Sequence, residues 1–99
     1  MPYQLKLSGM AARDFDREVE YSTRLWGKRH ALEHTREIRR LLNTIAHSPY
    51  AYPMREEFGE RIRATYYKTT RILYRINEEA KEVYVLGLLS TYRNIRFDE

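Results

Sequence analysis

The sequence predicts an α+β fold in which two antiparallel helices cover one face of a mainly antiparallel sheet. Three patterns predict it: a short alternating segment near the N-terminus, two consecutive amphipathic helical stripes, and three alternating segments in the last third of the chain. A chain of 99 residues with 42% hydrophobic content can bury one modest core. Residues 1–99 are therefore expected to form a single domain.

The N-terminal half is expected to form a strand followed by a helix hairpin. Tyr3–Ser8 alternates apolar and polar side chains, which is typical of a strand. From Ala11 the apolar residues recur with the period of an amphipathic helix, which Gly27 is expected to end. Trp26 is expected to pack in the hairpin core. A second stripe predicts a helix over Lys28–His47, and the short connection makes the two helices antiparallel.

The last third of the chain is expected to form a three-stranded antiparallel meander. Pro49 ends the second helix, and a loop is expected over Ser48–Gly59. Strands are predicted at Arg61–Tyr67, Thr70–Ile76 and Glu82–Leu89, with polar turns between them.

Side-chain alternation in these strands predicts a positively charged sheet face. Residues 61–77 contain five basic side chains and no acidic one. Ile72, Tyr74 and Ile76 share one face of their strand and are expected to receive the helices, which leaves the other face open. The side chains expected on the open face are Arg63, Tyr67, Arg71 and Arg75. Such a face would bind an anionic partner, either an acidic protein segment or nucleic-acid phosphates.

Composition excludes several classes of protein. The net charge is +4, with 14 Arg against 4 Lys, and arginine suits carboxylates and phosphates. The chain contains no cysteine, so disulfides and thiolate metal sites are excluded. No apolar run is long enough for a membrane span or a secretory signal, so a cytoplasmic location is expected.

Two histidines have a spacing that metal sites use. His30 and His34 lie four positions apart, which places both on one side of a helix. The intervening residues do not give the HExxH pattern, and no third ligand is evident. We therefore expect no metal and no cofactor, and both histidines are expected on a solvated helix face.

Several local motifs accompany the order of the elements. They are Tyr21–Gly27 (YSTRLWG), Ile45–Pro49 (IAHSP), Arg71–Ile76 (RILYRI) and Leu88–Asn94 (LLSTYRN). In this order and spacing, from Tyr3 to about Ile95, the chain resembles the RelE/ParE superfamily of bacterial type II toxin–antitoxin toxins. The Trp-Gly pair and the proline loop over Pro49–Pro53 resemble the ParE branch more.

This resemblance implies a toxin that is neutralised by a cognate antitoxin, whose C-terminal segment folds along it. ParE-type members are implied to poison DNA gyrase without a chemical step, and RelE-type members to cut mRNA in the ribosome. We expect a ParE-like, non-enzymatic toxin that inhibits growth by binding gyrase and contributes to plasmid stabilisation. Two alternatives stay open: a ribosome-dependent mRNA endonuclease, and a decayed toxin that only binds its antitoxin.

The expected binding residues are the four of the open face together with Tyr92 and Arg93. A ParE-like toxin would have no catalytic residue. For a nuclease, Arg71 and Arg93 match the arginine positions of the mRNA-cleaving branch and would stabilise the transition state. Tyr92 would then be the acid and Glu57, or a neighbouring glutamate, the base. The C-terminal histidine of several nuclease members is replaced here by Ser-Thr-Tyr, and the loop lacks their lysines.

Overall fold

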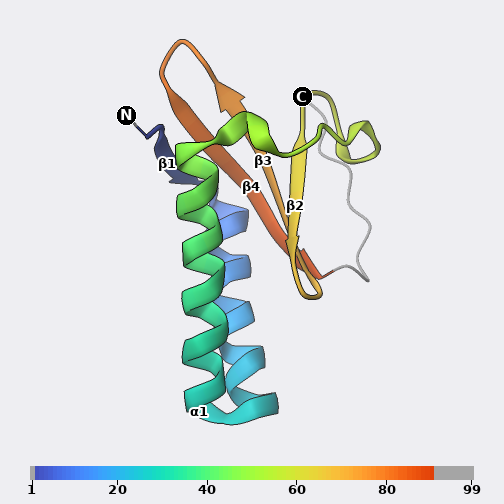
Figure 1. The fold of residues 1–99 in the computed structure, drawn as a ribbon. Coiled ribbons are helices and arrows are strands. Elements are labelled where there is room, and N and C mark those ends of the chain that lie inside the picture. Colours follow the sequence, from blue (N-terminus) through green and yellow to red (C-terminus); the bar gives the residue numbers. More distant parts are fainter. Residues whose placement is uncertain (1, 91–99) are drawn as a thin grey trace.

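The computed structural model describes residues 2–90. A long helical element, α1, covers one face of a four-stranded sheet, and two short 3-10 turns connect α1 to the second strand (Figure 1). The α+β class and the order of the elements predicted from the sequence are confirmed. Among the described residues, no helix is long and apolar enough to cross a membrane.

The helix hairpin is one element, α1, which spans Gly9–His47 and bends sharply at Gly27. Ser8 is its N-cap: the hydroxyl accepts a hydrogen bond from the amide of Ala11 at 2.9 Å, which satisfies a free donor of the first turn. Gly27 has φ 83° and ψ 170°, a conformation open essentially to glycine alone. The two arms on either side of it run antiparallel (Figure 1). The predicted antiparallel pair of helices meeting at Gly27 is thus present as the two arms of one element, which begins at Gly9 and not at Ala11.

The sheet consists of β1 (Gln4–Leu7), β2 (Arg63–Tyr67), β3 (Thr70–Asn77) and β4 (Glu82–Ser90) in the order β1-β4-β3-β2. The strands β2, β3 and β4 form the predicted antiparallel meander. β1 pairs in parallel with β4, so the sheet as a whole is mixed. β2 begins two positions later than predicted because Arg61 adopts a left-handed conformation with φ 58°.

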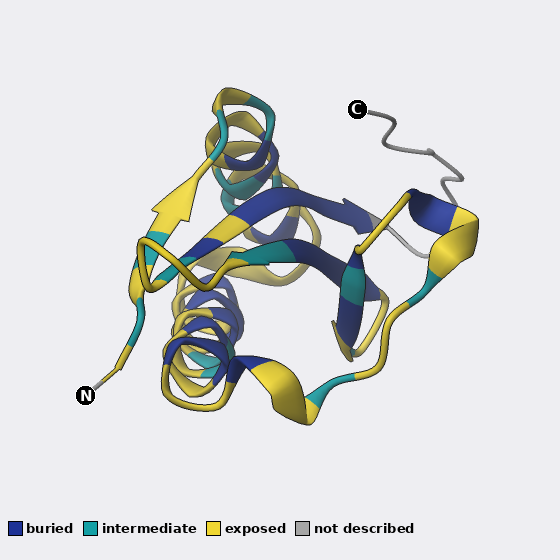
Figure 2. Ribbon diagram, turned by 90° about the horizontal axis from the view of Figure 1, so that it is seen from above, coloured by how far each residue is buried: buried dark blue, intermediate teal, exposed yellow. Residues whose placement is uncertain are grey.

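The main core lies between α1 and the sheet. Ile38, Leu42 and Ile45 of the second arm pack with residues of β3 and β4, and Ala11 adds a contact from the first arm. As predicted, the side of β3 that carries Ile72 and Tyr74 receives the helix. Figure 2 shows the two central strands buried over most of their length.

The segment between α1 and β2 holds the 3-10 turns η1 (Pro49–Ala51) and η2 (Glu56–Phe58). The buried hydroxyl of Tyr74 donates to the carbonyl of Pro49 at 2.6 Å and ties η1 to the core. Farther along, the amide of Ala64 donates a hydrogen bond to the carbonyl of Pro53 at 3.2 Å. Met54 and Arg63 form an isolated antiparallel β-bridge. This segment therefore lies beside the first half of β2, the edge strand of the sheet.

Candidate functional site

The residues expected on one open face lie on two different faces of the sheet. Arg63 pairs with Tyr74, and Tyr66 pairs with Arg71. Opposed residues of an antiparallel pair point to the same face. Arg63 and Tyr67 thus face α1 together with Tyr74, whereas Arg71 points to the other side. The prediction of a shared cationic face is wrong, because the two-residue turn between β2 and β3 pairs odd positions with even ones.

The sheet face opposite α1 is covered by a second hydrophobic cluster. The cluster consists of Phe58, Ile62, Ala64, Leu73, Leu86 and Leu89. Arg71 is only 9% exposed, and its guanidinium lies 4.5 Å from the centre of the Phe58 ring and 5.7 Å from that of Tyr66. Arg75 donates from Nε to the carbonyl of Glu60 at 3.0 Å. Both arginines hold the chain's own loop on this face, so it is not the bare surface expected.

Arg63, the first residue of β2, contacts the same loop to which Glu57 belongs. A terminal nitrogen of Arg63 donates to the carbonyl of Tyr52 at 2.6 Å, and its guanidinium lies 5.1 Å above the Tyr50 ring. Glu57 is exposed in η2, next to the phenylalanine on which Arg71 stacks. Arg63 therefore anchors the start of the loop. The predicted binding residues Tyr92 and Arg93 lie outside the described residues.

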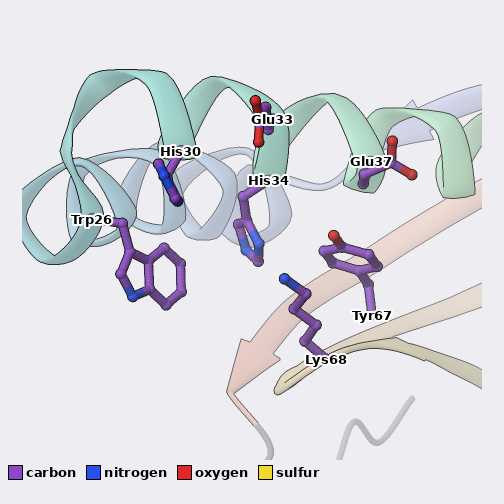
Figure 3. A pocket seen from close by; sticks show the side chains of 7 residues that line it. All are labelled: Trp26, His30, Glu33, His34, Glu37, Tyr67 and Lys68. Carbon is purple, nitrogen blue, oxygen red and sulfur yellow. The ribbon is translucent and has the colours of Figure 1, made fainter.

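A cleft of about 500 Å³ lies between the second arm of α1 and the turn from β2 to β3. Its lining residues are Trp26, His30, Glu33, His34, Glu37, Tyr67 and Lys68. Figure 3 shows the glutamates on the helix above the rings and the Lys68 ammonium directed toward the rings from the sheet side. Tyr67 is the predicted binding residue that the structure places in this cleft.

Three aromatic rings stand in a row along the cleft. The His34 ring lies 5.5 Å from Trp26 at an interplanar angle of 62°, and 5.3 Å from Tyr67 at 51°. Trp26, expected in the hairpin core, is 48% exposed. The reason is geometric: the tip of the hairpin extends beyond the sheet, so no strand covers it (Figure 1).

His34 links the two arms of α1 and, through Glu18, connects them to β3. It is 5% exposed, so the prediction of a solvated position is wrong for this residue. Its Nε2 lies 2.7 Å from the Glu18 carboxylate on the first arm, and the Thr70 hydroxyl of β3 donates to the same carboxylate oxygen at 3.0 Å. The signal in the sequence was its position four residues before Ile38, on the flank of the buried stripe.

The histidine pair does not form a metal centre. Across residues 2–90, no group of three or more His, Cys, Asp or Glu side chains is placed to hold a metal ion. His30 is exposed, whereas Nε2 of His34 is hydrogen-bonded to the Glu18 carboxylate. The cleft presents rings, two carboxylates and one ammonium group, and groups of these kinds occur at surfaces that bind other polypeptides.

Comparison with solved structures defines the class of this fold. The chromosomal ParDE toxin–antitoxin system from P. aeruginosa contains a chain that matches with a TM-score of 0.76 and 19% identity, over 89% of this chain and 95% of that one. The toxin–antitoxin complex RelBE2 from Mycobacterium tuberculosis gives 0.67 and 20%, over 91% and 92%. A free-state mutant of the E. coli toxin RelE gives 0.57 and 16%, over 92% and 85%. The chain therefore shares its fold with these solved chains.

Sequence comparison narrows the class to one family. Residues 5–95 match the family model described as the ParE toxin of the type II toxin–antitoxin system parDE. No curated protein sequence matches the chain. The match covers most of the chain, and the protein belongs to the ParE toxin family.

Proposed function

We propose that this protein is the toxin of a type II toxin–antitoxin pair, that it inhibits growth by binding DNA gyrase in the cytoplasm, and that a cognate antitoxin neutralises it. Membership of the ParE family supports the toxin assignment. The P. aeruginosa neighbour, solved as a ParDE system, supports an antitoxin partner. The mode of action, binding without a chemical step, is argued from the environment of one arginine.

The observation that carries this proposal is the position of Arg71. A nuclease would need this guanidinium beside the scissile phosphate, where charge develops in the transition state. Here Arg71 is almost fully buried against Phe58 and Tyr66. His34 belongs to α1, on the side of the sheet opposite Arg71, where its Nε2 lies 2.7 Å from the Glu18 carboxylate, and Nδ1 of His47 lies 2.9 Å from the carbonyl oxygen of Asn43. This arrangement favours a role for Arg71 in packing and a toxin that acts by binding.

The surface proposed for the antitoxin is the flank of the hairpin next to the β2 edge. Four large apolar side chains are exposed around the hairpin tip: Tyr21, Leu25, Trp26 and Leu32. Exposed apolar surface is typical of protein-binding sites when it is contiguous, and Trp26 is the member of this set that also lines the cleft. The cleft continues this surface to Tyr67 at the end of β2. An extended or helical antitoxin segment would therefore contact the hairpin and the edge strand together.

Primer-extension mapping of mRNA after brief induction tests the mode of action. The proposal predicts growth arrest without codon-phased cuts, and relief of the arrest by the product of an adjacent antitoxin gene. Codon-phased cuts would establish the ribosome-dependent endonuclease instead. Normal growth at full expression of soluble protein would establish a chain that has lost its toxicity.

A further inference from the structure

We propose that the cleft between the second arm of α1 and the β2–β3 turn receives an arginine side chain of the antitoxin. The inference rests on the proposed function for the identity of the partner. Its chemistry rests on the residues that line the cleft, namely a row of rings below a pair of carboxylates.

The rings supply faces on which a flat cation can lie. Trp26 and Tyr67 stand on either side of the buried His34, with neighbouring ring centres 5.5 and 5.3 Å apart. Their interplanar angles of 62° and 51° show that the rings are not stacked face to face. Nearly half of the Trp26 surface is open. A guanidinium is planar and weakly hydrated, so it stacks on such faces while keeping its N–H groups free for carboxylates.

The carboxylates supply the charge. Glu33 and Glu37 lie one helical turn apart on the rim of the cleft. Glu37 is already bound to Arg40 at 2.7 Å, whereas Glu33 is exposed and has no ion pair within residues 2–90. Glu33 is therefore the carboxylate available to an incoming cation.

The ammonium group of Lys68 already lies over one of these rings, that of Tyr67. This ammonium lies 5.5 Å from the centre of the Tyr67 ring, and the lysine side chain is exposed at the turn. An exposed lysine is held weakly and can leave the ring. A guanidinium from a partner would take its place, because it adds contacts with Trp26 and Glu33 that Lys68 does not make in this structure. Lys68 is thus a competitor of the ligand.

A fluorescence titration tests the cleft itself. Trp26 is the chain's single tryptophan, so its emission reports on this site alone. The probe is N-acetyl-arginine amide, and N-acetyl-citrulline amide is the neutral control of the same shape. We expect saturable quenching by the arginine probe and a several-fold weaker response to citrulline. Equal responses to the two probes would overturn the inference.

Two substitutions with opposite expected signs sharpen the test. Glu33→Gln should weaken binding of the arginine probe roughly threefold, the effect of one partly exposed charge, and Lys68→Ala should tighten it by a similar factor. Glu20→Gln is the matched control, because Glu20 lies outside the cleft lining and pairs with Arg24 on the first arm. Weaker binding by Lys68→Ala, or tighter binding of acetate than of the arginine probe, would identify an anion site instead.

Capture of the antitoxin separates this inference from the proposed function. If the wild-type chain captures the product of an adjacent antitoxin gene, and Glu33→Gln captures it several-fold more weakly, both proposals stand. If wild type and Glu33→Gln capture it equally, the arginine site is wrong and the toxin–antitoxin assignment stands. If wild type captures nothing, the assignment of the partner fails whatever the probes show.

Discussion

The turn of the hairpin gives the sharpest prediction about the fold. Gly27 has φ 83° and ψ 170°, and a Cβ atom added there would meet no atom within 4 Å. Replacing Gly27 by alanine therefore adds no clash with neighbouring groups, and the whole cost is backbone strain. For a non-glycine residue in this region the strain is about 1–3 kcal/mol, which corresponds to a loss of roughly 5- to 150-fold in the folding equilibrium constant.

Gly9→Ala is the matched control for this substitution. Gly9 begins α1 without a positive φ, and its added Cβ would lie 3.4 Å from the flexible end of Arg13. Alanine at such a position is expected to stabilise by about 0.5–1 kcal/mol, because it restricts the unfolded chain. Urea unfolding followed by circular dichroism measures both variants. If Gly27→Ala unfolds at the same urea concentration as Gly9→Ala, the strain assigned to the hairpin turn is not there.

Three further predictions concern the core and the surface. Tyr74→Phe removes the hydroxyl bound to Pro49 and leaves a buried carbonyl unpaired, so urea unfolding should show a loss of about 1–3 kcal/mol; an unchanged midpoint would mean that water replaces the hydroxyl. Ile38→Ala empties a fully buried position and should cost about 2–5 kcal/mol in the same assay, whereas Leu32→Ala, at an exposed position, should cost far less. Hydrogen bonds from Lys81, Tyr3 and Tyr50 lower the pKa of the Glu78 carboxyl to about 2. Since the folded pKa lies below the ordinary value of 4.5, this carboxylate stabilises the fold above that value, and its contribution is lost as the pH falls toward 2. Thermal unfolding against pH should therefore show a shallower acid decline for Glu78→Gln, and identical profiles would contradict the contacts.

Local periodicity was sufficient to predict the order of the elements. The change from alternation to a helical period located α1, and the glycine at position 27 located its turn. The alternation of Ile72 and Tyr74 also identified the side of β3 that the helix covers. These features depend on neighbouring residues in the chain, so the sequence displays them directly.

The shared face predicted for the candidate site depended on contacts between distant residues, and this part of the prediction is wrong. The relative faces of two strands depend on the length of the turn between them, and one residue more or less reverses every side chain. Arg63 and Arg71 were assigned to one face because this pairing was not visible in the sequence. The burial of Arg71 against Phe58, and of His34 against Glu18, joins residues far apart in the chain, which no local pattern displays.

A supercoiling assay with purified DNA gyrase tests the central claim most directly. The account predicts that the purified toxin inhibits gyrase in proportion to its concentration, and that prior addition of antitoxin abolishes the inhibition. Undisturbed gyrase activity at saturating toxin, together with mRNA cut on ribosomes by the same preparation, would contradict it.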